Sequence, residues 1–262
     1  MPNETVAVRS VTLYAAGSLR RALGELLPLF EHAHATRVEA LFGPAGLLRR
    51  RIETGESSDV FASANMEHPR RLFEAGLFGE PICFARNEIC AVVRRDLAIG
   101  TVGLIDAMLD PGLVLATSTP GADPSGDYAR TVFERVDRIR PGTGRTLAGK
   151  ARPLLGSGFV SEVPAGRAPG SWLIETGQAD IVLGYRSGTL GLDRAGPCAV
   201  VALPGDCAVT ASYGLAVARA SGEAAHALAA HLAGKQALAV LLRNGFLAPP
   251  GRPSAGIPTG QT

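Results

Sequence analysis

Short apolar runs alternate with longer segments of helical period along most of the chain. Eight runs are rich in β-branched residues and bounded by turn residues, as strands are: VRSVTLYAA, RVEALF, DVFASA, EICAVV, GLVLATS, ADIVLGY, AVVALP and ASYGLAVA. Strand alternating with helix is typical of parallel sheets that carry helices on both faces. The pattern therefore predicts an α/β protein.

The segments between these runs have the spacing of amphipathic helices. After the first run, apolar residues recur at i, i+3, i+4 and i+7, from Leu19 to Phe30. Further helices are predicted in GLLRRRIETG, EHPRRLFEAG, GDYARTVFERVDRI, GSWLIETGQ and GEAAHALAAHLAGKQALAVLLRNG, several of which end on a glycine suited to a C-cap. The final LAPPGRPSAGIPTGQT is rich in Pro, Gly and Ser without period, and we expect it to be unstructured.

Composition excludes several classes of protein. Of 262 residues, 46% are hydrophobic and 19% charged, which excludes a disordered chain. The 26 basic and 24 acidic residues are too balanced to indicate a nucleic-acid partner. No stretch approaches the roughly 18 uninterrupted apolar residues of a membrane span. We therefore expect a soluble chain that neither binds nucleic acid nor spans a membrane.

The first ten residues, MPNETVAVRS, lack the basic start and apolar stretch of a secretory signal. The sequence leaves two interpretations open: a cytosolic protein, or an extracytoplasmic one whose leader was removed or replaced.

The four cysteines show no CxxC spacing, so neither zinc binding nor dithiol redox chemistry is indicated. The simplest interpretation is buried small hydrophobic residues. A Cys83–Cys90 or Cys198–Cys207 bridge stays open as an alternative in an oxidising compartment.

Small residues replace bulky ones where the first strand gives way to a helix, in LYAAGSL. Ser18 is predicted to be the helix N-cap, beside backbone N–H groups that have no acceptor within the helix. A helix N-terminus carries roughly half a positive charge and suits an anion, which small neighbours would allow to approach. The alternative is that Ser18 only caps its helix.

Three further turns repeat this plan. In FGPAGLLRRRIETG a helix is expected from about Leu47, and Pro44 contributes no N–H, so the donors would be Ala45 and Gly46. The others precede helices around Ser125 and around Arg167. Four turns rich in N–H donors suggest convergence on one site, although every α/β protein needs such turns.

Catalytic and nucleotide-binding signatures are absent from the sequence. GRTLAGK, at residues 144–150, matches half of a phosphate loop, but Ala151 stands where Ser or Thr must bind magnesium, and no apolar strand precedes it. GSG at residues 156–158 is interpreted as a loop, and there is no G-x-S-x-G nucleophile elbow. No nucleophile, base and orienting group can be assembled, so we do not expect an enzyme.

The order of these motifs resembles that of the periplasmic molybdate-binding proteins of ABC transporters. The resemblance is carried by LYAAGSLRRALGELLPLFE, FGPAGLLRRRIETGESSDVFASAN, ADPSGDYARTVFE, ETGQADIVLGYRSG and LLRNGFLAP, and extends from about Val11 to Phe246. It implies the two-lobed periplasmic-binding-protein fold of type II, each lobe a mostly parallel sheet flanked by helices, with the ligand cleft between them. Lobe 1 would comprise residues 1–86 and 207–262, with a tail after about residue 249, and lobe 2 residues 87–206.

In this family the oxyanion is held by neutral hydroxyl and backbone N–H donors. The resemblance places donors at Ser18, Ala45, Gly46, Ser125, Arg167 and Tyr185. The family's second serine falls on Ala45, so only the amide of Ala45 or Gly46 could serve there. Ser125 would offer its backbone N–H and add a hydroxyl, while Arg167 aligns loosely and would either bring charge to the site or lie outside it.

The resemblance implies a monomeric periplasmic solute-binding protein that captures molybdate or tungstate and delivers it to a membrane ABC permease. No cofactor is expected, and molybdenum would bind as the oxyanion and not as a cation. Tetrahedral binding is favoured over six-fold coordination, because Leu47 and Leu48 stand where the tungstate branch carries a carboxylate. The alternatives are sulfate, another oxyanion, a small carboxylate clamped by Arg167, or a cytosolic ligand-sensing or enzyme domain.

Overall fold

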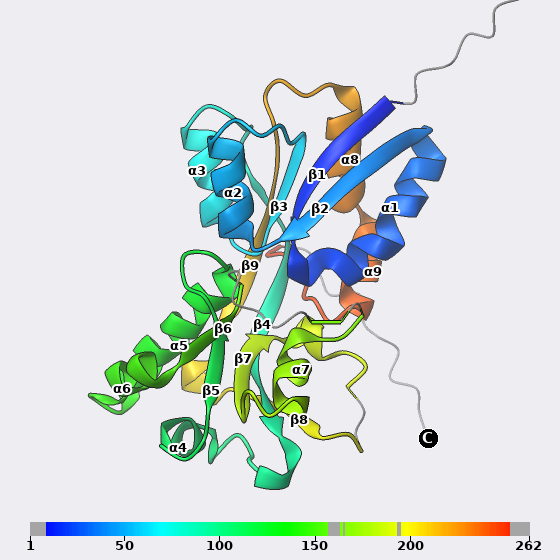
Figure 1. Cartoon of the computed structure of the whole chain (residues 1–262). Helices are drawn as coiled ribbons and strands as arrows, with labels where there is room; N and C mark the ends of the chain where they lie inside the picture. The colour runs from blue at the N-terminus through cyan, green and yellow to red at the C-terminus, as the bar shows by residue number, and fades with distance from the viewer. Residues whose placement is uncertain (1–8, 157–162, 165, 193–194, 252–262) are drawn as a thin grey trace, which may run out of the picture.

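Two lobes, each a sheet with helices on both sides, lie end to end in the computed structural model (Figure 1). The structure describes residues 9–156, 163–164, 166–192 and 195–251. Its strands are β1 (Arg9–Ala16), β2 (Thr36–Gly43), β3 (Val60–Ser63), β4 (Ile82–Arg94), β5 (Leu115–Ser118), β6 (Arg152–Leu155), β7 (Ile181–Tyr185), β8 (Cys198–Ala202) and β9 (Thr210–Val217).

The helices alternate with these strands. They are α1 (Arg20–His34), α2 (Ala45–Glu53), α3 (Glu67–Glu74), α4 (Leu104–Leu109), α5 (Pro124–Ile139), α6 (Thr143–Lys150), α7 (Pro169–Glu175), α8 (Glu223–Leu232) and α9 (Lys235–Arg243). Four short 3₁₀ segments are η1 (Gly17–Leu19), η2 (Arg95–Leu97), η3 (Arg186–Thr189) and η4 (Gly205–Cys207). In the first lobe α1, α8 and α9 cover one side of the sheet and α2 and α3 the other (Figure 1).

Each lobe combines parallel strands with antiparallel crossing strands. The strand order is β2-β1-β3-β9-β4-β7-β5-β6, and β8 pairs with β4. In the first lobe β1 is parallel to β2 and β3, and in the second β5 is parallel to β6 and β7. Strand β9 is antiparallel to β3, and β4 is antiparallel to β7, β8 and β9. The predicted two-lobed α/β fold of type II is confirmed.

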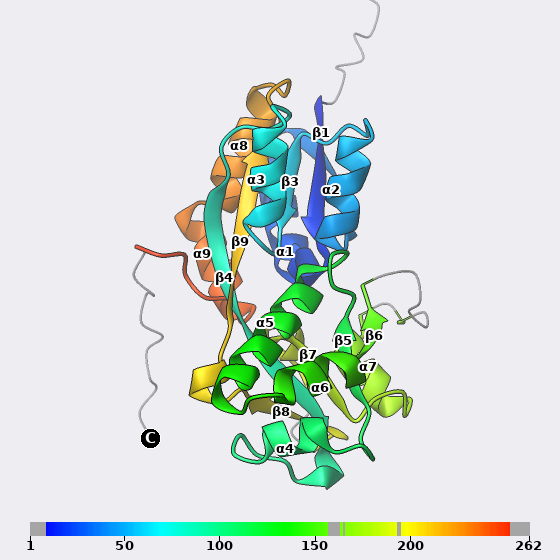
Figure 2. The same ribbon diagram turned by 90° about the vertical axis from the view of Figure 1, so that its left-hand side faces the viewer.

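Strand β4 belongs to both lobes. Its first half, from Ile82 to Glu88, pairs with β9, and its second half, from Ile89 to Arg94, pairs with β7 and β8. Figure 2 shows β4 and β9 side by side as they pass from one lobe towards the other. The lobes are therefore joined by continuous β-structure.

Separate apolar cores fill the two lobes. The first packs residues of β1, β3, α1, α8, α9 and β9, among them Leu23, Phe30 and Phe61. The second packs the latter half of β4 with β5, β7 and α5, including Leu115 and Val132. The lobe boundaries expected from the resemblance stay predictions.

All eight strands expected from the apolar runs are confirmed, but three short elements were missed. Strand β6, with sequence RPLL, contains a proline and follows a polar segment, while α4 and α6 are only 6 and 8 residues long. The GRTLAGK segment lies within α6 and so forms a helix, not a phosphate loop. Most of the GSG loop and the start of the chain lie outside the described residues.

Two differences concern the C-terminal region. The long segment predicted to be helical is two helices, because α8 ends at Leu232 and Gly234 caps α9. The first residues of the segment expected to be unstructured are ordered. Leu247 exchanges backbone hydrogen bonds with Arg86, at 2.7 and 2.9 Å, and Arg86 Nε donates to the Ala248 carbonyl. Residues 252–262 lie outside the described residues.

All four cysteines are free thiols, so neither bridge considered above is formed. Cys90, Cys198 and Cys207 are buried, and burial raises the pKa of Cys90 to about 12.

Within the described part of the chain no single helix is long and apolar enough to cross a membrane. Helices α8 and α9 reach that length and apolar character only together, as a pair bent by 50°.

His68 in α3 makes the stability of the first lobe sensitive to acid. It is 4% exposed, and within the described structure neither ring nitrogen has a hydrogen-bond partner. Burial, and then the nearby Arg49 charge, lower its pKa from 6.5 to about 4. Below pH 6.5 the unfolded chain binds a proton that the native protein does not, so stability falls as the pH drops towards 4.

We expect His68→Leu to remove this part of the acid sensitivity. The wild-type free energy of unfolding should fall between pH 7 and pH 4.5 by about 2 to 3 kcal/mol more than that of the variant. Urea denaturation at both pH values measures the difference. Equal losses in the two proteins would show that His68 binds its proton equally well in the native and unfolded states.

Candidate functional site

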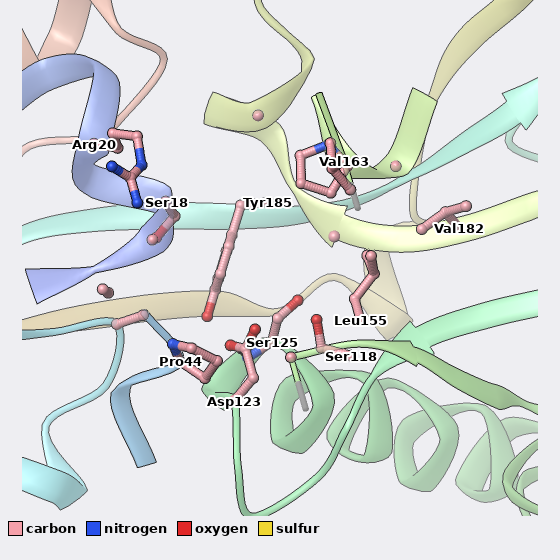
Figure 3. Close-up of a pocket in the computed structure, with 18 of the residues that line it drawn as sticks. Ser18, Arg20, Pro44, Ser118, Asp123, Ser125, Leu155, Val163, Val182 and Tyr185 are labelled. Carbon is pink, nitrogen blue, oxygen red and sulfur yellow. The ribbon is translucent and has the colours of Figure 1, made fainter. Parts of the chain in front are cut away.

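A cavity of about 380 Å³ lies between the two lobes. The first lobe lines it with the turns after β1 and β2, including Ser18, Pro44 and Ala45. The second lobe lines it with the ends of β5, β6 and β7 and the start of α5, including Ser118, Asp123, Ser125, Leu155 and Tyr185. Figure 3 shows the Tyr185 side chain extending across this space between Ser18 on one side and Ser125 on the other.

Ser18 lies in η1, between β1 and α1, and does not cap a helix. The N-cap residue of α1 is Leu19, and it makes no side-chain cap hydrogen bond. The N-cap prediction was therefore wrong: the Ser18 hydroxyl is instead 2.9 Å from the Tyr213 hydroxyl on β9. Ser18 nevertheless lines the cavity.

Two buried side chains behind Ser18 orient its hydroxyl. The Asn87 amide nitrogen donates to the Tyr213 hydroxyl at 3.3 Å and to Ser187 Oγ at 2.7 Å. Burial holds the pKa of Tyr213 above its ordinary value, so this hydroxyl keeps its proton. Because Tyr213 accepts from Asn87, it can donate to Ser18, and the Ser18 proton is then available to a ligand.

The turn after β2 supplies one backbone donor and not two. Helix α2 begins at Ala45 and not near Leu47, so the Ala45 N–H, at the first helical position, has no acceptor within the helix. The Gly46 N–H instead donates to the Ala122 carbonyl of the other lobe, at 3.0 Å. The structure therefore places Ala45 on the cavity and commits the predicted Gly46 donor to a contact between the lobes.

Ser125 offers its hydroxyl rather than its backbone. Asp123 is the N-cap of α5, and its Oδ1 accepts from the Ser125 N–H at 3.0 Å. The predicted backbone donor is therefore occupied by the helix cap. Ser125 is 6% exposed and lines the cavity, where its hydroxyl is the group left for a ligand.

Tyr185 ends β7 and carries the polar atom with the clearest need of a partner. Its hydroxyl is buried and makes no hydrogen bond of good geometry to a described residue, although the Tyr213 hydroxyl lies near enough to help raise its pKa. Burial raises its pKa well above the ordinary value, so the hydroxyl stays protonated. The ring is held edge-on between Tyr128 and Tyr213, at centroid distances of 6.4 and 5.7 Å. An unpaired buried hydroxyl is costly, and an anion in the cavity would satisfy it.

Arg167 is placed outside the cavity. Its guanidinium pairs with Glu175 and lies 5.7 Å from the Trp172 ring centre, and its N–H donates to the Pro164 carbonyl at 3.1 Å. Both of its donor groups are thus engaged elsewhere. The prediction that Arg167 brings a ligand donor to the site, as an aligned amide or as a carboxylate clamp, is not supported by this placement.

Two ionisable residues of the lining were missed by sequence reasoning. Arg20, the first residue of α1, is exposed and lies over Phe42, with Cζ 4.6 Å from the ring centre. Asp123 was hidden because Asp-Pro before a helix is an ordinary capping signature. Arg20, Asp123 and Tyr185 are the ionisable side chains among the described residues that line the cavity.

Comparison with known proteins agrees with this architecture. The model of the family described as bacterial extracellular solute-binding protein matches residues 11–247. An uncharacterised protein of Pasteurella multocida, PM1146, is 35% identical over 205 residues, covering 78% of this chain and 85% of its own length. The molybdate-binding protein ModA of Mycobacterium tuberculosis is 28% identical over 226 residues, covering 84% of this chain and 77% of its own.

Solved structures share the fold at lower identity. The sulfate-binding protein SubI of Mycobacterium tuberculosis has a TM-score of 0.75 at 20% identity, covering 93% of this chain and 88% of its own. The periplasmic molybdate-binding protein of Azotobacter vinelandii has a TM-score of 0.71 at 17% identity, covering 91% of this chain and 99% of its own. At these identities the likeness concerns the fold alone.

The contact between Gly46 and the other lobe predicts how a single methyl group alters the cleft. A Cβ on Gly46 would lie 2.6 Å from the Gly121 carbonyl oxygen and 2.7 Å from that of Ala122. Neither is a mobile side-chain end, so we expect Gly46→Ala to push the lobes apart, at a cost to this arrangement of about 1 to 3 kcal/mol.

Small-angle scattering of the ligand-free protein measures this opening, with circular dichroism as the check on folding. Gly17→Ala is the matched control, because a Cβ on Gly17 meets nothing within 4 Å. A larger radius of gyration in Gly46→Ala alone is expected. Identical scattering from both variants would contradict the role assigned to this contact.

Proposed function

We propose that this chain, which belongs to the bacterial extracellular solute-binding proteins, captures a small tetrahedral oxyanion between its lobes and delivers it to an ABC permease. Molybdate and tungstate are the leading ligands. The observation that carries the proposal is Tyr185, which lines the cavity and whose buried hydroxyl lacks a hydrogen-bond partner among the described residues. The proposal includes no catalytic step and no cofactor.

The donors around the cavity suit an anion that only accepts hydrogen bonds. Ser18, Ala45, Ser125 and Tyr185 line it from four separate segments, and the first-turn N–H of Ala45 and the three hydroxyls are the donors they can offer. Hydrogen bonds to a charged acceptor are stronger than those between neutral groups, about 1.5 to 3 kcal/mol each, so a few neutral donors can hold a desolvated anion. Arg20 adds positive charge to the same cavity.

The choice of molybdate or tungstate rests on relatives that carry the name molybdate-binding protein and on the motif order they share with this chain. We also place the protein outside the cytoplasmic membrane and expect a monomer, since the site is complete within one chain. Sulfate is the second candidate, because Ala45 lacks a hydroxyl and the Gly46 and Ser125 amides are engaged, which leaves fewer donors than expected.

Tyr185→Phe separates a ligand-binding role from a structural one. The hydroxyl has no partner among the described residues, so its removal should leave the ligand-free melting temperature unchanged or slightly raised. Loss of one hydrogen bond to the anion should weaken binding by about tenfold to a hundredfold. Thermal unfolding with molybdate, tungstate, sulfate and phosphate measures both, since a ligand at 100 times its dissociation constant adds about 2.7 kcal/mol.

Tyr128→Phe is the matched control, because Tyr128 packs against Tyr185 without lining the cavity. It should bind like the wild type. Equal affinity of the wild type and Tyr185→Phe would mean that the anion does not contact this hydroxyl, and a response to sulfate alone would select the second candidate.

A further inference from the structure

A carboxyl group lines the cavity in which we place an anion. Asp123 forms part of the wall together with Ser118 and Ser125, and Figure 3 shows it beside Ser125, near the hydroxyl end of Tyr185. If Asp123 were ionised, it would repel the ligand, because two like charges in a partly dehydrated cavity are only weakly screened from each other. An anion and an ionised Asp123 therefore do not suit the same cavity.

The surroundings of Asp123 lack a compensating cation. None of the ion pairs among the described residues includes it. The backbone at the end of β6 covers the carboxyl, because a Cβ on Gly156 would lie 2.6 Å from Asp123 Cβ and 3.0 Å from its Oδ2. A covered carboxyl group without a cation favours its neutral form.

Only one carboxyl oxygen is needed to cap α5. Oδ1 accepts from the Ser125 N–H at 3.0 Å, and a carbonyl oxygen still accepts this bond in the acid, although less strongly than the carboxylate does. The acid form therefore keeps the helix cap and leaves the other oxygen, Oδ2, to carry a proton.

Burial and the neighbouring Asp127 charge also favour the neutral form of Asp123. Burial raises the pKa of Asp123; hydrogen bonds from the Ser125 N–H and the Ser118 hydroxyl oppose this only in part, and the charge of Asp127 on α5 adds to it. The tyrosines that face it do not titrate near neutral pH, because burial raises the pKa of Tyr128, Tyr185 and Tyr213. Arg20 is the basic residue among the described residues of the lining.

We infer that Asp123 is a ligand-binding residue that acts as the neutral acid, its Oδ2–H donating a hydrogen bond to the bound oxyanion. It thereby supplies a hydroxyl donor that Ala45 cannot. The inference rests on the proposed function, since it needs an anion in the cavity. Binding then takes up one proton from solvent wherever Asp123 is ionised in the free protein, and the site selects anions that only accept hydrogen bonds.

This coupling fixes the direction of the pH dependence. Below the pKa of Asp123 in the free protein, affinity for a fully deprotonated oxyanion is independent of pH. Above it, each pH unit removes a further factor of ten in the fraction of protein that carries the proton, so the dissociation constant rises tenfold per unit.

Calorimetric titration of molybdate into the full chain tests the inference, from pH 6.5 to 8.5, in pairs of buffers that differ in ionisation enthalpy. We expect proton uptake to rise with pH, towards one proton per anion where Asp123 is ionised in the free protein. Asp123→Asn should bind within about threefold of the wild type at pH 6.5, without proton uptake and without pH dependence. Its amide oxygen still caps α5 and its NH₂ still donates to the anion.

Asp127→Asn is the matched control. Asp127 lies on the same helix and accepts from the Gly121 N–H at 2.8 Å, but it does not line the cavity, so this variant should still take up the proton. The onset of uptake should move to lower pH, because the charge that helps to raise the pKa of Asp123 is gone. Proton uptake that persists in Asp123→Asn would also overturn the inference, since the proton would then belong to another group.

The protonation state of Asp123 in the complex decides the inference directly. An infrared carboxylate band of Asp123 in the molybdate complex, identified by its absence from Asp123→Asn, would overturn the inference and leave the proposed function standing. Absence of binding by molybdate, tungstate and sulfate at every pH would overturn both.

Discussion

The buried side-chain amide of Asn87 links the two lobes by hydrogen bonds and, through Tyr213, orients a residue of the cavity wall. It is fully buried on β4, where that strand passes from one sheet to the other, and donates to Ser187 in the second lobe and to Tyr213 on β9. Tyr213 in turn contacts Ser18 of the first lobe. The orientation of the Ser18 hydroxyl thus depends on the same residue that connects the crossing strands, and the lobes cannot rearrange there without exposing unpaired polar groups.

This arrangement makes the site depend on hydroxyl groups more than on backbone amides. The amides of Gly46 and Ser125 are occupied, by a contact between the lobes and by a helix cap. What remains is a set of hydroxyls on side chains held by buried neighbours, together with the Ala45 N–H and the Asp123 carboxyl. Neutral donors of this kind select a ligand by its shape and by its ability to accept the hydrogen bonds that they would otherwise leave unmade. Arg20 contributes positive charge, without a fixed polar partner among the described residues.

Sequence patterns predicted the strands and much of the cavity wall, because both follow from local physical chemistry. Tyr185 was placed by the resemblance to the molybdate-binding proteins and not by a local pattern. The hydrogen bond from Gly46 to Ala122 and the ion pair of Arg167 with Glu175 could not be predicted, because they depend on tertiary contacts that no local pattern encodes. Asp123 was overlooked because its capping role accounts for its presence in the sequence.

The central claim is that the anion sits between the lobes on the donors of Ser18, Ala45 and Tyr185. A crystal structure grown with molybdate, with anomalous scattering recorded from molybdenum, tests it most directly. The account predicts a single strong peak between the lobes, with its oxygens within hydrogen-bond distance of these three donors. A peak outside this cavity, or a well-ordered closed cleft without one, would contradict it.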